Sequence, residues 1–227
     1  MNKEELHKLI TFSECASLNT SLYWTWSDII TANIIVENET KYTKTIKGIN
    51  DKLYGSFSKI NLSSLNEIDS FHDEPDRTSL DNKYFSEVIS LLGPSLKGKS
   101  SKFIDAVEEM INKRPNQKCH ISSQQLGGNT LEIEENTSSF IHRESIWKPW
   151  ITASWQNNDH NEKRKSLEWI EETWDILKFY FPWIHLAQMH PHLKFHKKEI
   201  KAAFGNWLPE LQQLKSKYDP EGILPLL

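Results

Sequence analysis

Two short segments alternate between apolar and polar side chains, and this alternation constrains the fold more than any other feature of the chain. They span residues 118–125 and 151–156. A repeat of two residues is typical of a strand with one buried face, and such strands form antiparallel sheets that helices cover on one side. The apolar positions hold Cys119, Ile121, Ile151, Ala153 and Trp155. The polar positions hold His120, Ser122, Gln124, Thr152, Ser154 and Gln156.

Apolar residues spaced three and four apart predict helices over residues 4–12, 100–112 and 167–181, with Ser100 as an N-cap. Residues 31–37 alternate and predict a further strand. Residues 40–53 fit either a strand or a helix, 62–71 a helix and 73–81 a polar loop. Together they predict a single α+β domain over 1–227, an antiparallel β-sheet with helices packed on one face.

The C-terminal residues predict an amphipathic helix with defined ends. Asn206 is a suitable N-cap, and Pro209 falls in the first turn, where a missing amide costs nothing. The segment from Asp219 to Gly222 ends the helix. We expect its apolar stripe to dock on the sheet; the stripe consists of Trp207, Leu208, Leu211, Leu214 and Tyr218.

Composition narrows the class of protein. A net charge of −4 and a pI near 6.1 give no electrostatic case for nucleic acid. Hydrophobic residues make up 37%, and no apolar run approaches the ~18 residues of a spanning helix, so we expect no membrane association. The first residues lack the apolar core of a secretory signal, which favours a cytoplasmic protein. Cys15 and Cys119 do not form a disulfide framework.

Several motifs follow one another in an order that matches a known family. Gly127-Gly128 precedes an aromatic-x-His-Arg motif at 140–143, a strand ending in Trp155, and a helix with Trp169-Ile170. Residues 204–220 then read Phe-Gly-Asn, Leu-x-x-Leu-Lys and Tyr-Asp-Pro. This succession resembles the C-terminal substrate domain of berberine-bridge-enzyme-like FAD-linked oxidases, of the vanillyl-alcohol-oxidase type. The match is clear over 118–227 and faint over 1–117.

The resemblance implies a sheet whose polar face meets the flavin ring and the substrate, whereas an ordinary polar face would simply meet water. The family holds FAD in a separate N-terminal domain, and this sequence has no G-x-G-x-x-G fingerprint. We therefore expect no cofactor-binding residues in the isolated chain, and FAD only through a partner. The candidate substrate-facing residues are His120, Ser122, Gln124, Thr152, Ser154 and Gln188.

One departure from the family concerns its chemistry. Members usually carry a Tyr-x-Asn motif before the last helices; here His185 and Ala187 stand at those positions. An imidazole could still act as a base near neutral pH, so His185 is the candidate catalytic residue. The loss of both family residues nevertheless indicates altered or lost activity.

Two histidine motifs have more than one interpretation. His185, His190, His192 and His196 suggest a metal-dependent hydrolase, but neither a Cys pair nor a carboxylate completes the ligand set, so we expect no metal site. The His142-Arg143 pair fits a surface role as well as a pocket role.

Two functions remain. The chain is either the substrate-binding subunit or remnant of an FAD-linked oxidoreductase, inactive alone, or a non-catalytic module that binds a small molecule or a protein. The family's opening strands lack a counterpart before residue 4, which predicts an exposed sheet edge that pairs with a separate FAD-binding domain or with another copy.

Overall fold

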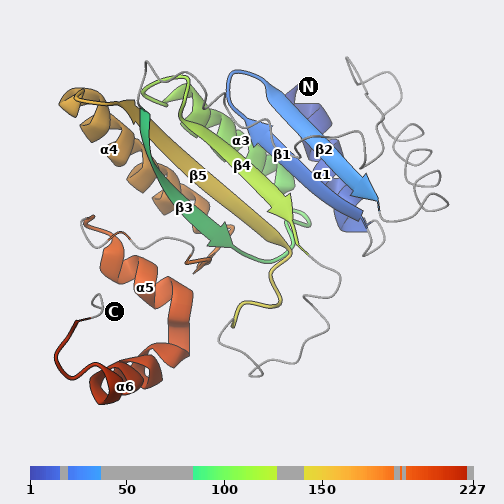
Figure 1. The fold of residues 1–227 in the computed structure, drawn as a ribbon. Coiled ribbons are helices and arrows are strands. Elements are labelled where there is room, and N and C mark those ends of the chain that lie inside the picture. The colour runs from blue at the N-terminus through green and yellow to red at the C-terminus, as the bar shows by residue number, and fades with distance from the viewer. Residues whose placement is uncertain (16–19, 37–83, 127–140, 187–189, 191–192, 224–227) are drawn as a thin grey trace.

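The computed structural model describes residues 1–15, 20–36, 84–126, 141–186, 190 and 193–223. Its centre is a six-stranded sheet in the order β2-β1-β4-β5-β3-β6 (Figure 1). All neighbouring strands are antiparallel, as predicted. The strands are β1 (Thr20–Trp26), β2 (Ile30–Val36), β3 (Tyr84–Leu92), β4 (His120–Gln125), β5 (Trp147–Gln156) and β6 (Trp183–Ile184).

The pairing register separates the two sets of side chains as the alternation predicts. Ile121 lies opposite Ile151, and Trp24 opposite Ser123. Trp24, Ile121 and Ile151 are fully buried in the core on this apolar face. The intervening positions of β1, β4, β5 and β3 form the second face, which we call the polar face.

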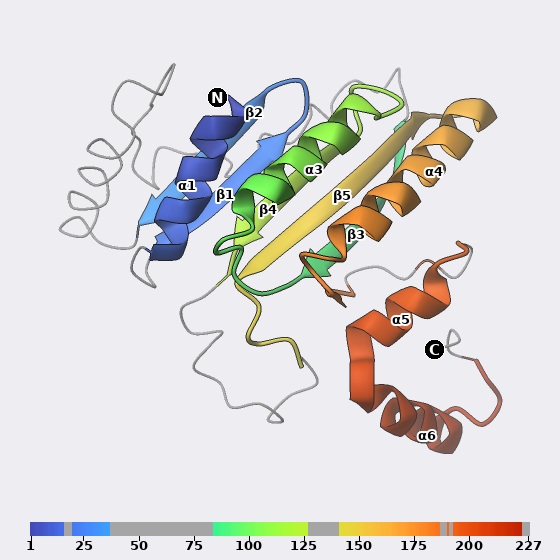
Figure 2. The ribbon, with the colours of Figure 1, turned by 180° about the vertical axis from the view of Figure 1, so that it is seen from behind.

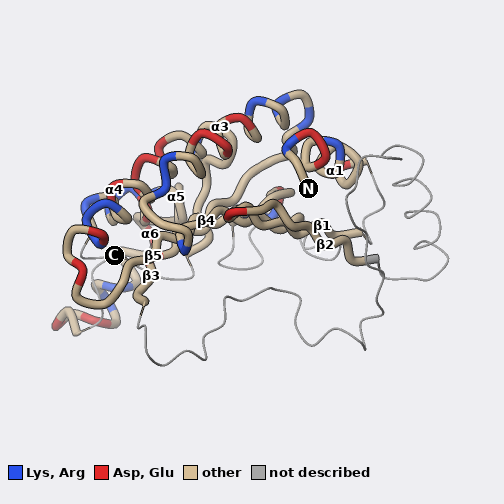
Figure 3. The backbone as a smooth tube through the Cα atoms, turned by 90° about the horizontal axis from the view of Figure 1, so that it is seen from above, with Lys and Arg blue, Asp and Glu red and all other residues tan. Residues whose placement is uncertain are grey.

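Three helices cover the apolar face and lie side by side, as Figure 2 shows: α1 (Lys3–Cys15), α3 (Ser100–Asn112) and α4 (His160–Leu177). The view from above places all three on the same side of the sheet (Figure 3). The α+β class with helices on one face is therefore confirmed. The predicted 100–112 helix matches α3, whereas α1 is longer than predicted and α4 begins earlier, because the Asp159 side chain accepts a hydrogen bond from the Glu162 amide at 2.8 Å.

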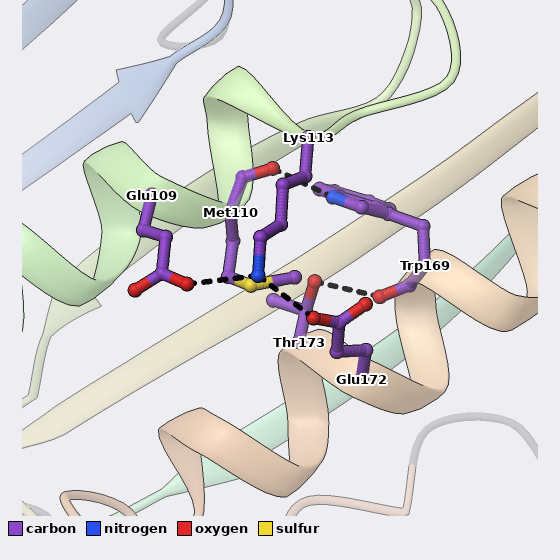
Figure 4. A network of polar contacts seen from close by, with 6 residues as sticks. All are labelled: Glu109, Met110, Lys113, Trp169, Glu172 and Thr173. Carbon is purple, nitrogen blue, oxygen red and sulfur yellow. Dashed lines mark hydrogen bonds and ion pairs between the residues drawn. The ribbon is translucent and has the colours of Figure 1, made fainter.

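Polar contacts tie α3 to α4 (Figure 4). The Trp169 indole N–H donates to the Met110 carbonyl at 2.7 Å, inside the core. Closer to the surface, the Lys113 ammonium bridges Glu109 on its own helix and Glu172 on α4, at 2.8 and 3.0 Å. The buried bond fixes the spacing of the helices, and the exposed ion pairs add little.

Both predicted N-caps are wrong. Lys99 precedes α3 without a side-chain cap, and the Ser100 hydroxyl lies 3.0 Å from His7 Nδ1 instead. Asn206 lies within a short 3-10 turn, η3 (Gly205–Trp207), so the last helix, α6 (Leu208–Tyr218), begins after it. Pro209 does fall in the first turn of that helix.

The C-terminal helices lie apart from the sheet's covered face (Figures 1 and 2). Helix α5 (His196–Phe204) packs near β6, and α6 contacts α5 and η3. No residue of α6 is buried, and Leu214 and Tyr218 are 47% and 73% exposed. The prediction that this stripe docks on the sheet is wrong, because α1, α3 and α4 already cover the apolar face.

Several predictions fall on residues outside the described part. They concern the segments 40–53, 62–71 and 73–81, and the residues Gly127, Gly128, Phe140, Ala187, Gln188 and His192. Among the helices that the structure describes, none combines the length and the apolar character needed to cross a membrane.

Candidate functional site

The polar face carries five of the six candidate substrate-facing residues. Within β4, His120, Ser122 and Gln124 alternate with apolar-face positions, and the register sets them opposite Thr152, Trp150 and Lys148 of β5. Ser154 lies on the same face, opposite Ser86 of β3. The alternation of the sequence thus brings residues of two separate segments onto one surface. No helix described here covers it.

Hydroxyl groups form a layer close to the backbone of this face. Thr25 Oγ1 lies 2.9 Å from Ser122 Oγ and donates to the Tyr23 hydroxyl at 2.8 Å. Ser86 and Ser154 share a hydrogen bond of 2.8 Å. Ser122, Ser154 and Thr152 are buried, at 1%, 4% and 9% exposure. The longer side chains around these three residues would therefore contact a ligand first.

Two aromatic rings form the centre of that longer layer. Tyr23 of β1 stacks on Trp150 of β5, with ring centroids 5.7 Å apart and planes inclined by 30°. Both side chains are half-buried. An offset aromatic pair of this kind offers a flat surface on which an apolar or ring-shaped ligand could lie.

Basic side chains lie at two places on the polar face. Burial lowers the pKa of His120, despite its hydrogen bond with the Lys118 carbonyl. Lys148 lies on β5, four residues before Thr152, the residue opposite His120. Burial also lowers the pKa of Lys148.

His185, the candidate base, follows β6 directly and donates its backbone N–H to the Ser90 carbonyl at 2.9 Å. Burial lowers its pKa, and the nearby Lys148 charge lowers it further. The imidazole is therefore neutral at pH 7 and chemically able to accept a proton.

One segment bears directly on the expectation that the isolated chain has no cofactor-binding residues. Residues 93–100 read G-x-x-x-x-G-K-S and join β3 to α3, which is the spacing and context of a nucleotide-binding P-loop. Gly93, however, uses its N–H for Trp147, and a Cβ there would lie 2.7 Å from the Phe181 backbone. The sequence pattern alone could not reveal this structural reason for the glycine.

Further polar groups of this loop are also engaged. The Glu14 carboxylate accepts from the Leu96 amide at 2.6 Å and from the Ser95 hydroxyl at 2.8 Å. The Lys99 amide donates to the Leu96 carbonyl at 2.8 Å. A protein carboxylate thus occupies one of the amides that a phosphate would need. These residues do not fit the diphosphate of FAD.

The histidine cluster is organised by carboxylates. His190 is fully buried, with Nδ1 2.6 Å from Glu199 of α5 and Nε2 3.1 Å from Glu87 of β3. His196 Nδ1 lies 3.5 Å from the other Glu199 oxygen. Burial disfavours the charged ring, but the hydrogen bonds and charges of Glu199 and Glu87 prevail and raise the pKa of His190 to about 9. In the described part of the chain, no group of three or more potential ligands is arranged to hold a metal ion.

His142 does not form a surface pair. Its ring is buried and stacks on Trp183 with centroids 5.3 Å apart. Nε2 lies 3.1 and 2.9 Å from the carbonyl oxygens of Ala202 and Ala203, at the end of α5. His142 therefore joins the segment before β5 to the C-terminal helices, and Arg143 beside it is only half-buried.

The described residues also form an open cavity of about 410 Å³ away from the polar face. It lies where the β1–β2 turn meets the end of α3, and Trp26, Asp28 and Arg114 contribute to it. Arg114 there is already paired with Asp28. Because its arginine is already paired and none of the candidate substrate-facing residues lines this cavity, we regard the polar face as the better candidate.

No protein-family model and no curated protein sequence matches this chain. Solved structures do. BBE-like 1 of Physcomitrella patens aligns with a TM-score of 0.69 and 15% identity over 99% of this chain and 50% of its own. The berberine bridge enzyme of Eschscholzia californica aligns with a TM-score of 0.60 and 14% identity over 99% of this chain and 51% of its own. A chitooligosaccharide oxidase aligns with a TM-score of 0.60 and 13% identity over 96% of this chain and 50% of its own. The chain spans about half the length of these proteins, and it has the fold of that half of a berberine-bridge-enzyme-like protein.

Proposed function

We propose that this chain is the substrate-binding half of an FAD-linked oxidoreductase and that a separate polypeptide carries the FAD. This proposal rests mainly on the polar face, where candidate residues from β4 and β5 lie together on the side of the sheet opposite the three packed helices. The fold likeness to half of the berberine-bridge-enzyme-like proteins supports the assignment.

In this proposal the chain binds and orients a small molecule. The ligand lies on the Tyr23–Trp150 pair, and the Gln124 amide and the His120 ring supply hydrogen bonds at its edge. Ser122 and Ser154 act underneath, because their hydroxyls already bond to neighbours and hold those side chains in place. His185 is the candidate acceptor for a proton from a bound hydroxyl group.

The second candidate function is a non-catalytic module that uses the same face to bind a small molecule or a protein. Within the described residues, the loop at 93–100 has its Leu96 amide and Ser95 hydroxyl occupied by Glu14, which favours either function over an oxidase that works alone. A neighbouring reading frame that encodes an FAD-binding domain would support the first function, and its absence across related genomes would favour the second.

Sheet edges supply the means for a partner to attach. In the described part of the chain, β2 pairs only with β1, and β3 meets β6 only at Leu91 and Leu92. Unpaired strand edges bind other strands readily. We propose that the FAD-bearing partner, or a second copy of this chain, adds at such an edge. Light scattering at micromolar concentration tests self-association, and a strictly monomeric chain would leave only the separate partner.

Ligand mapping by NMR tests the binding role. We expect benzyl alcohol and benzamide to shift the Trp150 indole signal and the amides of β4 and β5. The Gln124→Ala variant should weaken binding several-fold, in line with the loss of about 1 kcal/mol for one hydrogen bond. The matched Gln212→Ala variant changes an exposed residue of α6 and should bind as the unmodified chain does. Shifts confined to the helices, or no shifts, would contradict the proposal.

A further inference from the structure

One end of the polar face brings together four polar or aromatic side chains, which come from two strands and the loop after β6. Gln124 of β4 lies opposite Lys148 of β5, and Trp150 of β5 lies opposite Ser90 of β3. The Ser90 carbonyl holds the backbone of His185, which places that residue beside the same end of the sheet. Tyr23 lies opposite Gln124 and stacks on Trp150, so the aromatic pair borders this end.

Among the described strand residues, the charge at this end of the polar face is the Lys148 ammonium. The six described strands contain one carboxylate, Glu87, and that residue lies on the apolar face with His190. Figure 3 shows the charged residues gathered on the helices, while the strands are almost free of them. The polar-face positions of the strands therefore contain Lys148 and no Asp or Glu.

Lys148 is half-buried, and no described carboxylate forms an ion pair with it. Its burial lowers its pKa, while no acid described here offsets the cost of desolvating the ammonium group. Its charge also lowers the pKa of His185, whose backbone is held by Ser90 beside the same end of the sheet. A partly desolvated cation without an acidic partner favours an anion as its ligand.

We propose that this end of the polar face, formed by Gln124, Lys148, Trp150 and His185, binds the carboxylate of a small aromatic acid. The proposal rests on the proposed function, because it names the substrate class of the same face. The Lys148 ammonium pairs with the carboxylate, and the Gln124 amide and one His185 N–H donate hydrogen bonds to its oxygens. The ring of the acid lies on the Tyr23–Trp150 pair.

Benzoate and benzamide are the probes for this inference, because they differ mainly in charge. We expect benzoate to bind the full chain at least about 10-fold more tightly than benzamide in NMR titrations of the Trp150 indole. The Lys148→Met variant keeps most of the apolar stem and should remove this preference. Lys148→Arg keeps the charge and should retain most of it. Lys165→Met, on an exposed part of α4, is the matched control and should leave both affinities unchanged.

Each outcome distinguishes the two claims. Equal affinity for benzoate and benzamide on the polar face would overturn the carboxylate site and leave the binding role intact. A preference for benzoate that survives in a folded Lys148→Met variant, with folding checked by circular dichroism, would also overturn it. Failure of benzoate, benzamide and benzyl alcohol alike to shift the face would overturn both claims.

Discussion

At the scale of single residues, Glu14 shows how one carboxylate organises several segments. Its oxygens accept from the Trp147 indole at 2.6 Å, the Leu96 amide at 2.6 Å and the Ser95 hydroxyl at 2.8 Å. These groups belong to β5 and to the loop before α3, whereas Glu14 lies near the end of α1. Charge-assisted hydrogen bonds of this length are stronger than neutral ones, so this residue fixes the loop that resembles a nucleotide-binding motif.

Replacing Glu14 by Ala should destabilise the chain by about 1–3 kcal/mol, because the fully buried Trp147 indole N–H loses its acceptor. Urea unfolding followed by tryptophan fluorescence measures the difference. Glu168→Ala is the control: it removes an exposed carboxylate that pairs with Arg164, and it should change stability by less than about 0.5 kcal/mol. Equal effects of the two variants would show that the Glu14 bonds contribute nothing.

At the scale of elements, sequence periodicity predicts the helices and strands whose buried face consists only of apolar or small residues. Helix α3 and strand β4 are of this kind. Strand β1 is not predicted because Tyr23 and Trp24 place aromatic rings on both faces. Strand β3 is not predicted because Glu87 interrupts its apolar face, and the partner that makes this tolerable, His190, lies far along the chain.

The candidate site likewise has one part that the sequence predicts and one part that it does not. Alternation predicts which side chains share the polar face, since that depends only on neighbours in sequence. The proximity of Lys148 and His185 depends on how β5, β3 and β6 pair, and no local pattern carries that information. Helix α6 illustrates the converse, because an amphipathic pattern does not say which surface is still free to receive it.

The contrast between α4 and α6 gives a test of packing. Trp174 of α4 is 5% exposed, and its ring meets Phe195 edge-on with centroids 5.2 Å apart. Trp174→Ala should therefore cost about 3–5 kcal/mol in urea unfolding. Leu214→Ala, on the exposed stripe of α6, should cost less than about 0.5 kcal/mol. A loss below about 1 kcal/mol for Trp174, or a large loss for Leu214, would contradict the described packing.

The buried His190 joins α5 to β3 and makes this junction dependent on pH. Its pKa rises from about 6.5 in the unfolded chain to about 9, because of Glu199 and Glu87. The folded state thus binds the proton more tightly, so the stabilisation is complete below pH 6.5 and is lost as the pH rises toward 9. The loss is at most roughly 3–4 kcal/mol, since each pH unit between the two pKa values corresponds to about 1.4 kcal/mol.

Urea unfolding at several pH values between 6.5 and 9 measures this loss, and the His190→Gln variant isolates it. The difference in stability between the original chain and the variant should shrink as the pH rises, because the variant has no proton to lose. A difference that stays constant over this range would show that His190 is neutral in the folded chain.

At the scale of the whole molecule, the chain has the fold of half of a berberine-bridge-enzyme-like protein, and its described loop with a phosphate-binding sequence pattern is occupied by the protein's own groups. The segment 93–100 has the matching sequence pattern, yet its groups bind Trp147, Glu14 and Leu96. A diphosphate needs clustered backbone amides or cations directed at it. We therefore expect the purified chain to be colourless and to release added FAD during gel filtration. The visible absorbance of the protein peak, read against a flavoprotein standard, measures retention. A yellow protein peak would show that this chain holds the cofactor itself, and the proposal of a separate FAD-bearing polypeptide would then lose its basis.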